Sequence, residues 1–313
     1  MIVPRMTSGI ALAFVCLGLL GVMPIIANSR PDGFGALGFA FLLSVWQVVF
    51  AVPLFAWGLR GSEKGIFSAK LSGRERRRAL WVALLTGAMF GLSTYLYVLG
   101  VEKAGAVSAA IAIQAYPLFA ILWETLFLKR RKTPVELILT AALIAALYFL
   151  GTGGSGRIDG FSPWFLLALG VPFLWSIAHV IIKEELGRRP VTPAQVTFFR
   201  VLISTVFLGS VVVAVEPSDF AATLLRADFQ FFGAVMGLVY YLELIAWFHA
   251  VRHIDVSLAS SITTPWPALT MALAVIFLGD RIEPYQIVAF VVVAASIYGL
   301  LVASLRKEKR HAA

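Results

Sequence analysis

Long apolar segments separated by short polar connectors fill this sequence from end to end. A helix needs about 20 mostly apolar residues to cross the hydrocarbon core of a bilayer, and the segments are of about that length. Backbone groups exposed to lipid must bond within their own segment, so we expect every segment to be a helix. The ten predicted spans are 7–28, 34–58, 79–100, 104–128, 134–151, 161–183, 193–214, 229–251, 256–278 and 284–304.

The basic residues of the connectors predict how these spans lie in the membrane. If the N-terminus is inside, 20 of the 26 Lys and Arg residues fall in inner segments and five fall in outer segments. Inner connectors of membrane proteins carry such an excess of Lys and Arg. We therefore expect an even number of crossings, with both termini in the cytoplasm.

The composition agrees with a chain that is buried in a membrane over most of its length. Hydrophobic residues make up 60% of the 313 positions and charged residues 14%, whereas a soluble domain carries about a quarter charged residues. The net charge of +9 fits basic loops on one side of a membrane better than nucleic-acid binding. The single cysteine, Cys16, excludes an internal disulfide and a cysteine-rich metal site. We predict an all-α integral membrane protein.

The first span has some features of a secretory signal peptide. Arg5 precedes the apolar run, and small residues follow it at Ala27 and Ser29. The run is long for the apolar core of a signal peptide, and more crossings follow it. We expect this segment to stay in the protein as the first helix.

The two halves of the chain resemble each other when the sequence is shifted by 150 residues. Pro117 then falls on Pro267, and Leu128 falls on Leu278. Each half holds five spans, an odd number, so the second half must cross the membrane in the opposite sense to the first. Inverted repeats of this kind recur in secondary transporters. The predicted division is a first five-helix repeat at 1–152, an outer linker at 153–160 and a second five-helix repeat at 161–313.

One glycine-rich motif has to be rejected. Residues 151–156 read Gly-Thr-Gly-Gly-Ser-Gly and match a dinucleotide-binding fingerprint letter by letter. They lie between two predicted spans with no preceding strand, so the context that the fingerprint needs is missing. The chain also has no Walker loop and no His-Glu-x-x-His zinc motif. We expect no cofactor, no metal site and no enzymatic activity.

The fourth span of each half carries its proline in the same register, and the second half continues into Leu278-Gly279-Asp280. In these features the chain resembles the EamA family of the drug/metabolite transporter superfamily, over essentially its whole length. The first half departs from the family pattern, because Lys129 and Arg130 follow Leu128 there. The resemblance implies a carrier of small metabolites, often an exporter, and such carriers include amino-acid exporters.

Two ionisable residues lie at membrane depth, where an unpaired charge costs several kcal/mol. At about 1.5 Å per residue, Arg200 and Glu243 both lie some 10–13 Å from the predicted inner ends of their spans. Glu243 could bind a substrate ammonium group or carry a coupling proton, and Arg200 could bind a carboxylate. The alternative is a structural ion pair that locks the seventh span to the eighth.

The prolines of the fourth and ninth spans mark a second candidate region. Pro117 and Pro267 each remove a backbone hydrogen bond and bend their helix, so we predict that they act as gating kinks. Carbonyls freed near the midplane can bind a polar ligand, although prolines also make ordinary packing kinks. The neighbouring candidates for substrate binding are Gln114, Tyr116, Thr264 and Trp266.

Aromatic side chains supply the last candidates. Tyr95 and Trp175 could stack on an aromatic ligand or cover a cation, or they could be ordinary interface anchors. Glu124 is close to an inner connector, and a structural role is the simpler reading. The four histidines are scattered along the chain and are more simply explained as solvated or hydrogen-bonded residues.

The architecture predicts a secondary transporter in the inner membrane, and the resemblance implies that it exports amino acids or related amphipathic metabolites. Access to its site would alternate between the two inverted repeats. Its partners would be a small-molecule substrate and membrane lipids, with no nucleic acid, and ten helices suffice for a monomer. The alternatives are a channel or a structural membrane partner, and, less favoured, a membrane enzyme acting on lipids.

Overall fold

A computed structural model gives the fold of residues 3–60, 65–67, 72–116, 118–119, 122–123, 133–188, 192–215, 225–254, 259 and 262–312. Within these residues every regular element is a helix. The long helices are α1 (Val3–Asn28), α2 (Ala36–Arg60), α3 (Gly73–Ala104), α6 (Pro134–Gly151), α7 (Pro163–Arg188), α8 (Pro193–Val215), α10 (Ala227–His253) and α13 (Pro284–Ala312). The short ones are η1 (Gly65–Phe67), α4 (Ala106–Ile113), η2 (Ile158–Gly160), α12 (Trp266–Leu273) and η3 (Ala274–Leu278).

Each of the ten predicted spans contains helix in the part of the chain that the structure describes. Seven helices are long and apolar enough to cross a membrane, and the apolar stretches Pro163–His179 and Trp266–Leu278 are shorter. The remaining span, 104–128, begins with α4, and much of it lies outside the described residues. The chain is therefore an all-helical, multi-pass membrane protein.

Two helices begin earlier or more sharply than their apolar residues alone would indicate, because capping boxes start them. The Ser72 side chain accepts a hydrogen bond from the Glu75 N–H, and the Glu75 carboxylate accepts one from the Ser72 N–H. Thr133 and Glu136 repeat this arrangement at the start of α6. Each box satisfies backbone donors that a helix start leaves unpaired. The predicted start of the third span at residue 79 was therefore six residues too late.

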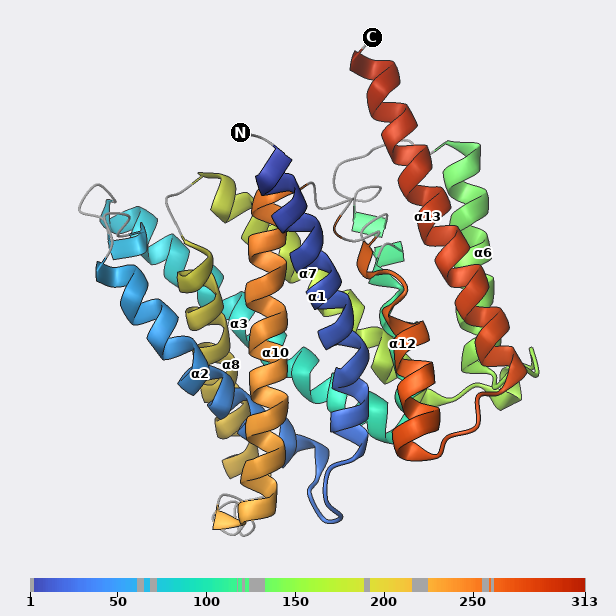
Figure 1. Cartoon of the computed structure of the whole chain (residues 1–313), viewed down its shortest axis with the longest axis horizontal. Coiled ribbons are helices and arrows are strands. Elements are labelled where there is room, and N and C mark those ends of the chain that lie inside the picture. Colours follow the sequence, from blue (N-terminus) through green and yellow to red (C-terminus); the bar gives the residue numbers. More distant parts are fainter. Residues whose placement is uncertain are drawn as a thin grey trace.

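Both termini lie at the same end of the helix bundle (Figure 1). We call this the terminal end, and the opposite end, which carries the loop between α1 and α2, the distal end. A chain whose ends meet on one side crosses an even number of times. This arrangement agrees with the predicted even number of crossings.

Helices of one half pack mainly against helices of the other. α1 packs along α10, and α7 packs along α3. α2 packs on both α8 and α10, α3 packs on α8, and α6 pairs with α13 (Figure 1). We number the helices of each half from first to fifth and exchange the two halves. The pair α1–α10 then becomes α7–α3, and α2–α10 becomes α8–α3, whereas α2–α8 and α6–α13 return to themselves.

Two glycines let these helices approach closely. A Cβ atom at Gly87 of α3 would lie 2.6 Å from the Ile203 side chain of α8. A Cβ atom at Gly237 of α10 would lie 2.7 Å from the Leu43 carbonyl oxygen of α2. The two glycines are 150 residues apart, which is the shift that aligns the halves. Small residues at such crossings are a common packing device in membrane helices.

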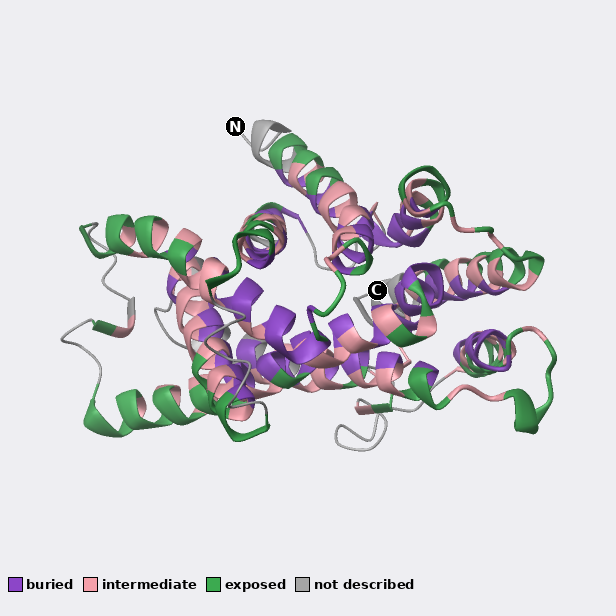
Figure 2. Ribbon diagram, turned by 90° about the horizontal axis from the view of Figure 1, so that it is seen from below, coloured by how far each residue is buried: buried purple, intermediate pink, exposed green. Residues whose placement is uncertain are grey.

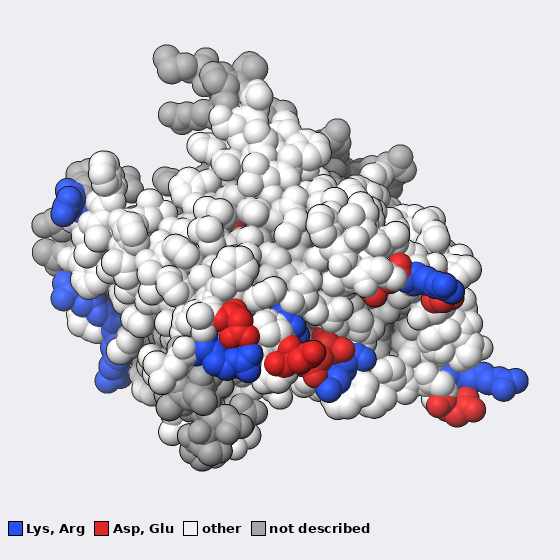
Figure 3. Space-filling model, turned by 60° about the horizontal axis from the view of Figure 1, so that its bottom comes forward, with Lys and Arg blue, Asp and Glu red and all other residues white. Residues whose placement is uncertain are grey.

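Burial follows the sides of the helices that face one another (Figure 2). Large apolar residues such as Trp57, Trp81 and Phe277 are exposed on the outside, where lipid rather than water would cover them. On the face shown in Figure 3, charged side chains form a few small groups and leave wide neutral areas. Buried polar side chains are therefore the natural place to look for a functional site.

Candidate functional site

The fourth and ninth spans are both interrupted at equivalent points. Helix α4 ends at Ile113, residues 114–115 form a turn, and Tyr116 is helical again. In the second half, residues 264–265 form the turn and α12 starts at Trp266. The interruptions are 150 residues apart, and each precedes the proline of its span by two or three residues. Pro267 lies in the first turn of α12, where a missing N–H is tolerated, whereas Pro117 lies outside the described residues.

The two interruptions touch each other. The Gln114 side-chain amide donates a 2.8 Å hydrogen bond to the Thr264 carbonyl oxygen. Thr264 and Trp266 are buried, and Gln114 is half-buried. The Tyr116 ring lies 5.8 Å from the His179 ring of α7. These four predicted residues therefore come together around the junction of the two halves, with Tyr116 turned toward α7.

Arg200 is buried in α8 with little to satisfy its charge. The residue is only 6% exposed. Its Cζ atom lies 3.4 Å from the centroid of the Phe90 ring. Nη2 donates a long 3.4 Å hydrogen bond to the Tyr240 hydroxyl. Nη1 has no hydrogen-bond partner among the described residues. A buried guanidinium in this state is costly unless another group pairs with it.

Glu243 lies one turn from Tyr240 on α10 and is also buried. It feels the Arg200 charge, but the two described side chains are not within ion-pair distance, because Arg200 turns to Phe90 and Tyr240 instead. The predicted alternative of a direct structural pair is therefore not what the structure contains. The Cys16 thiol donates a 3.5 Å hydrogen bond to the Glu243 carbonyl oxygen and ties α1 to α10.

A third buried polar side chain completes this group. Tyr97 of α3 lies within electrostatic range of Tyr240 and Glu243, and its hydroxyl has no partner among the described residues. We call Arg200, Tyr240, Glu243 and Tyr97 the polar cluster. It joins α3 of the first half to α8 and α10 of the second.

The two aromatic candidates differ in their surroundings. The Trp175 indole N–H donates a 3.0 Å hydrogen bond to the Ser93 hydroxyl, and Ser93 donates to the Phe90 carbonyl. Trp175 thus supports the segment of α3 on which Arg200 rests. Tyr95 is half-buried and packs against the apolar core. Glu124, the acid to which we assign a structural role, lies outside the described residues.

A cleft leads from the terminal end toward Arg200. It opens between the start of α3, the end of α7 and the start of α8, and its cavity volume is about 70 Å³. Most of its lining is apolar, and the polar lining residues are Thr86, Gln195 and Arg200. A buried, poorly paired cation that lines such a cleft can bind a small anionic group that reaches it.

Helical periodicity connects the cleft to the polar cluster. Thr86 lines the cleft, and Phe90, Thr94 and Tyr97 follow it on the same face of α3 at intervals of three or four residues. Sequence reasoning missed Phe90 and did not group Tyr97 and Tyr240 with Arg200. The spacing along α3 was readable, but the helices that this face would meet were not. Among the described residues, no group of three His, Cys, Asp or Glu side chains could hold a metal ion.

Comparisons with known proteins place this architecture among transporters. Residues 162–302 match the family model described as "EamA-like transporter family". The "Probable terminal-alkyne amino-acid exporter" of Streptantibioticus cattleyicolor is 25% identical over 261 residues, which cover 82% of this chain and 81% of that protein. The "Pseudopaline exporter CntI" of Pseudomonas aeruginosa is 28% identical over 129 residues, which cover 40% of this chain and 41% of that protein.

A solved crystal structure of another protein has the same fold. It matches with a TM-score of 0.61, at 18% identity, over 98% of this chain and 99% of the other. The likeness therefore extends through both halves, although the family model matches the second.

Proposed function

We propose that this chain, whose residues 162–302 match the model of the EamA-like transporter family, is a secondary transporter that exports small metabolites across an inner membrane. The names of the two exporters to which it is similar support this direction and substrate size. The cleft at the terminal end supports it as well, because that end would face the cytoplasm if the basic connectors are inside. Substrate would then enter from the cytoplasm.

The proposed mechanism is alternating access between two inverted five-helix repeats, at 1–152 and 161–313. Two observations support this division. The set of helix pairs stays the same when the two halves are exchanged, and the helix interruptions at residues 114 and 264 are 150 residues apart. Interrupted helices near the midplane are where transporters of this architecture bind and gate. Pro117 and Pro267 would hold these interruptions open as hinges, and Gln114, Tyr116, Thr264 and Trp266 would line the path.

The proposed substrate is an amino acid or a related amphipathic metabolite. Its carboxylate would bind Arg200, and its ammonium group would bind Glu243, which is also the candidate for proton coupling. Trp175 and Tyr95 would help to shape the site. The observation that carries this assignment is the buried Arg200 guanidinium, which lines the cleft and has an unpartnered Nη1 among the described residues.

A thermal-shift assay on the detergent-purified protein tests the assignment directly. We expect pooled amino acids to raise the unfolding temperature, since a ligand at a hundredfold excess over its Kd stabilises by about 2.7 kcal/mol. The same amino acids as methyl esters should have little effect, because they lack the carboxylate. Arg200→Gln should abolish the difference between acid and ester.

The matched control is Arg157→Gln, which removes an exposed arginine from the linker and should keep the full response. Efflux of the stabilising ligand from proteoliposomes, with counterflow against the unlabelled compound, then separates a carrier from a channel. An equal response of acid and ester in the wild type would remove Arg200 from the substrate site. Flow without counterflow would replace the carrier with a channel.

A further inference from the structure

The shift of 150 residues that aligns the two halves gives the cleft at the terminal end a counterpart at the distal end. In this counterpart, side chains occupy the space. Shifting α3 by 150 residues onto α10 places Ala79 and Thr86 of the cleft at Phe229 and Met236. Phe229 and Met236 are both buried. The corresponding region of α2 is occupied by Trp46, whose indole N–H donates a 2.8 Å hydrogen bond to the Gln230 side chain of α10.

An aromatic plug fills this distal space. The Phe34 ring, from the loop between α1 and α2, stacks on Phe229 of α10 with centroids 3.9 Å apart and planes at 3°. Phe39 meets Phe34 edge-on at 5.2 Å. The plug joins a loop of the first half to the start of a helix of the second, so it must separate before anything can pass at the distal end.

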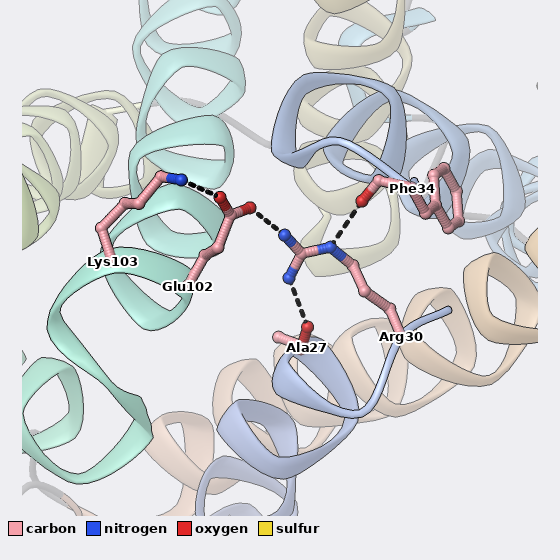
Figure 4. Close-up of polar contacts among 5 residues, drawn as sticks. All are labelled: Ala27, Arg30, Phe34, Glu102 and Lys103. Atoms are coloured by element: carbon pink, nitrogen blue, oxygen red, sulfur yellow. Dashed lines mark hydrogen bonds and ion pairs between the residues drawn. The ribbon is translucent and has the colours of Figure 1, made fainter. Parts of the chain in front are cut away.

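A buried arginine holds the loop that carries this plug (Figure 4). Arg30 donates a 2.6 Å hydrogen bond from Nη1 to the Ala27 carbonyl and a 2.7 Å hydrogen bond from Nε to the Phe34 carbonyl. Its Nη2 pairs with the Glu102 carboxylate at the end of α3. The Arg30 side chain is 8% exposed and the Glu102 side chain 28%, so the pair is partly shielded from water, and its hydrogen bond is charge-assisted.

We propose that the Arg30–Glu102 pair is the latch of a distal gate whose moving part is the Phe34–Phe229 plug. In the state described here the gate is shut while the cleft at the terminal end is open. The latch fixes the loop through the Phe34 carbonyl, and releasing Glu102 frees the loop to carry Phe34 away from Phe229. The inference rests on the proposed two-sided access, but its test requires no substrate.

Cysteine labelling in nanodiscs, where both ends are open to water, tests the latch. In a Cys16→Ser background, Met236→Cys reports on the space behind the plug, since Met236 is fully buried on the Phe229 side of α10. Ala83→Cys reports on the cleft at the terminal end, which Ala83 lines. A water-soluble maleimide should label Ala83→Cys quickly and Met236→Cys slowly.

Glu102→Gln keeps the shape of the side chain and removes its charge. We expect it to speed the labelling of Met236→Cys by about tenfold or more, the scale of a lost charge-assisted hydrogen bond. Labelling of Ala83→Cys should hardly change, because the state that exposes it is already dominant. An unchanged midpoint of thermal unfolding shows that the variant has kept its fold.

The matched control is Lys103→Gln. Lys103 pairs with the other oxygen of Glu102 at 2.7 Å. It belongs to the same helix as Glu102, and its ammonium group lies over the Trp164 ring of α7 rather than on the Phe34 carbonyl, so its loss should leave both labelling rates as they are. The latch would be overturned if Glu102→Gln left the labelling rate of Met236→Cys unchanged. It would also be overturned if Lys103→Gln raised that rate by the same factor. Failure to transport amino acids would leave it untouched, since no substrate enters the measurement.

Discussion

Two buried arginines show how differently the same side chain can be satisfied. Arg30 donates to two backbone carbonyls and a carboxylate, and burial lowers its pKa from the ordinary value while Glu102 acts in the opposite direction. Among the described residues, Arg200 has a long hydrogen bond to Tyr240, an aromatic face and an unpartnered Nη1. The contacts of Arg30 account for its buried side chain. The part of the chain that the structure describes gives no such account of Arg200, which favours a ligand as the missing partner.

At this scale, Glu243→Gln tests proton coupling. A glutamine of nearly the same shape cannot release or take up a proton, so transport by this variant should lose its dependence on pH. The measurement is efflux of the identified substrate from proteoliposomes over a series of pH values. If the variant and the wild type have the same rate at every pH, Glu243 carries no coupling proton.

At the scale of helices, the sequence predicts the features that depend on neighbouring residues along the chain. The spans follow from the length of the apolar runs, and the early start of α3 was readable from Ser72 and Glu75, three residues apart. The interruptions follow only approximately from the prolines, because the turn at 264–265 precedes Pro267. The contact between Arg200 and Phe90 could not be predicted, since it depends on which helices become neighbours and how each is rotated.

The crossing of α10 over α2 gives a stability prediction. In Gly237→Ala the new methyl group would meet the Leu43 carbonyl at 2.7 Å, and backbone cannot move aside cheaply. We expect a loss of about 1–3 kcal/mol in unfolding free energy, the usual cost of overpacking, seen as a lower midpoint of thermal unfolding in detergent.

The control for this prediction is Gly18→Ala in α1, where a Cβ atom would meet nothing within 4 Å. That change should be neutral or slightly stabilising, because alanine is the better helix former. Equal midpoints for the two variants would show that the α10–α2 crossing is looser than described.

For the whole molecule, the sidedness of the bundle decides whether the cleft loads from the cytoplasm. Both termini share one end, and the basic connectors predict that this end lies inside. We expect a green fluorescent protein fused after residue 313 to fluoresce and an alkaline phosphatase fused there to be inactive. A phosphatase fused to a chain cut after residue 156, in the linker, should be active. The reverse pattern would place the terminal end and its cleft on the outer side, which would contradict loading from the cytoplasm.

The hydrogen bond between Gln114 and Thr264 has a consequence for how motion in this protein can be measured. These residues are each other's counterparts, so an exchange of the two halves returns their contact to itself. In the proposed mechanism both ends of the bundle swing about this contact, so distances across it should vary least. The distance between two spin labels placed near this contact would therefore be a constant reference. Changes in the distances between labels at the two ends of the bundle can be compared with it.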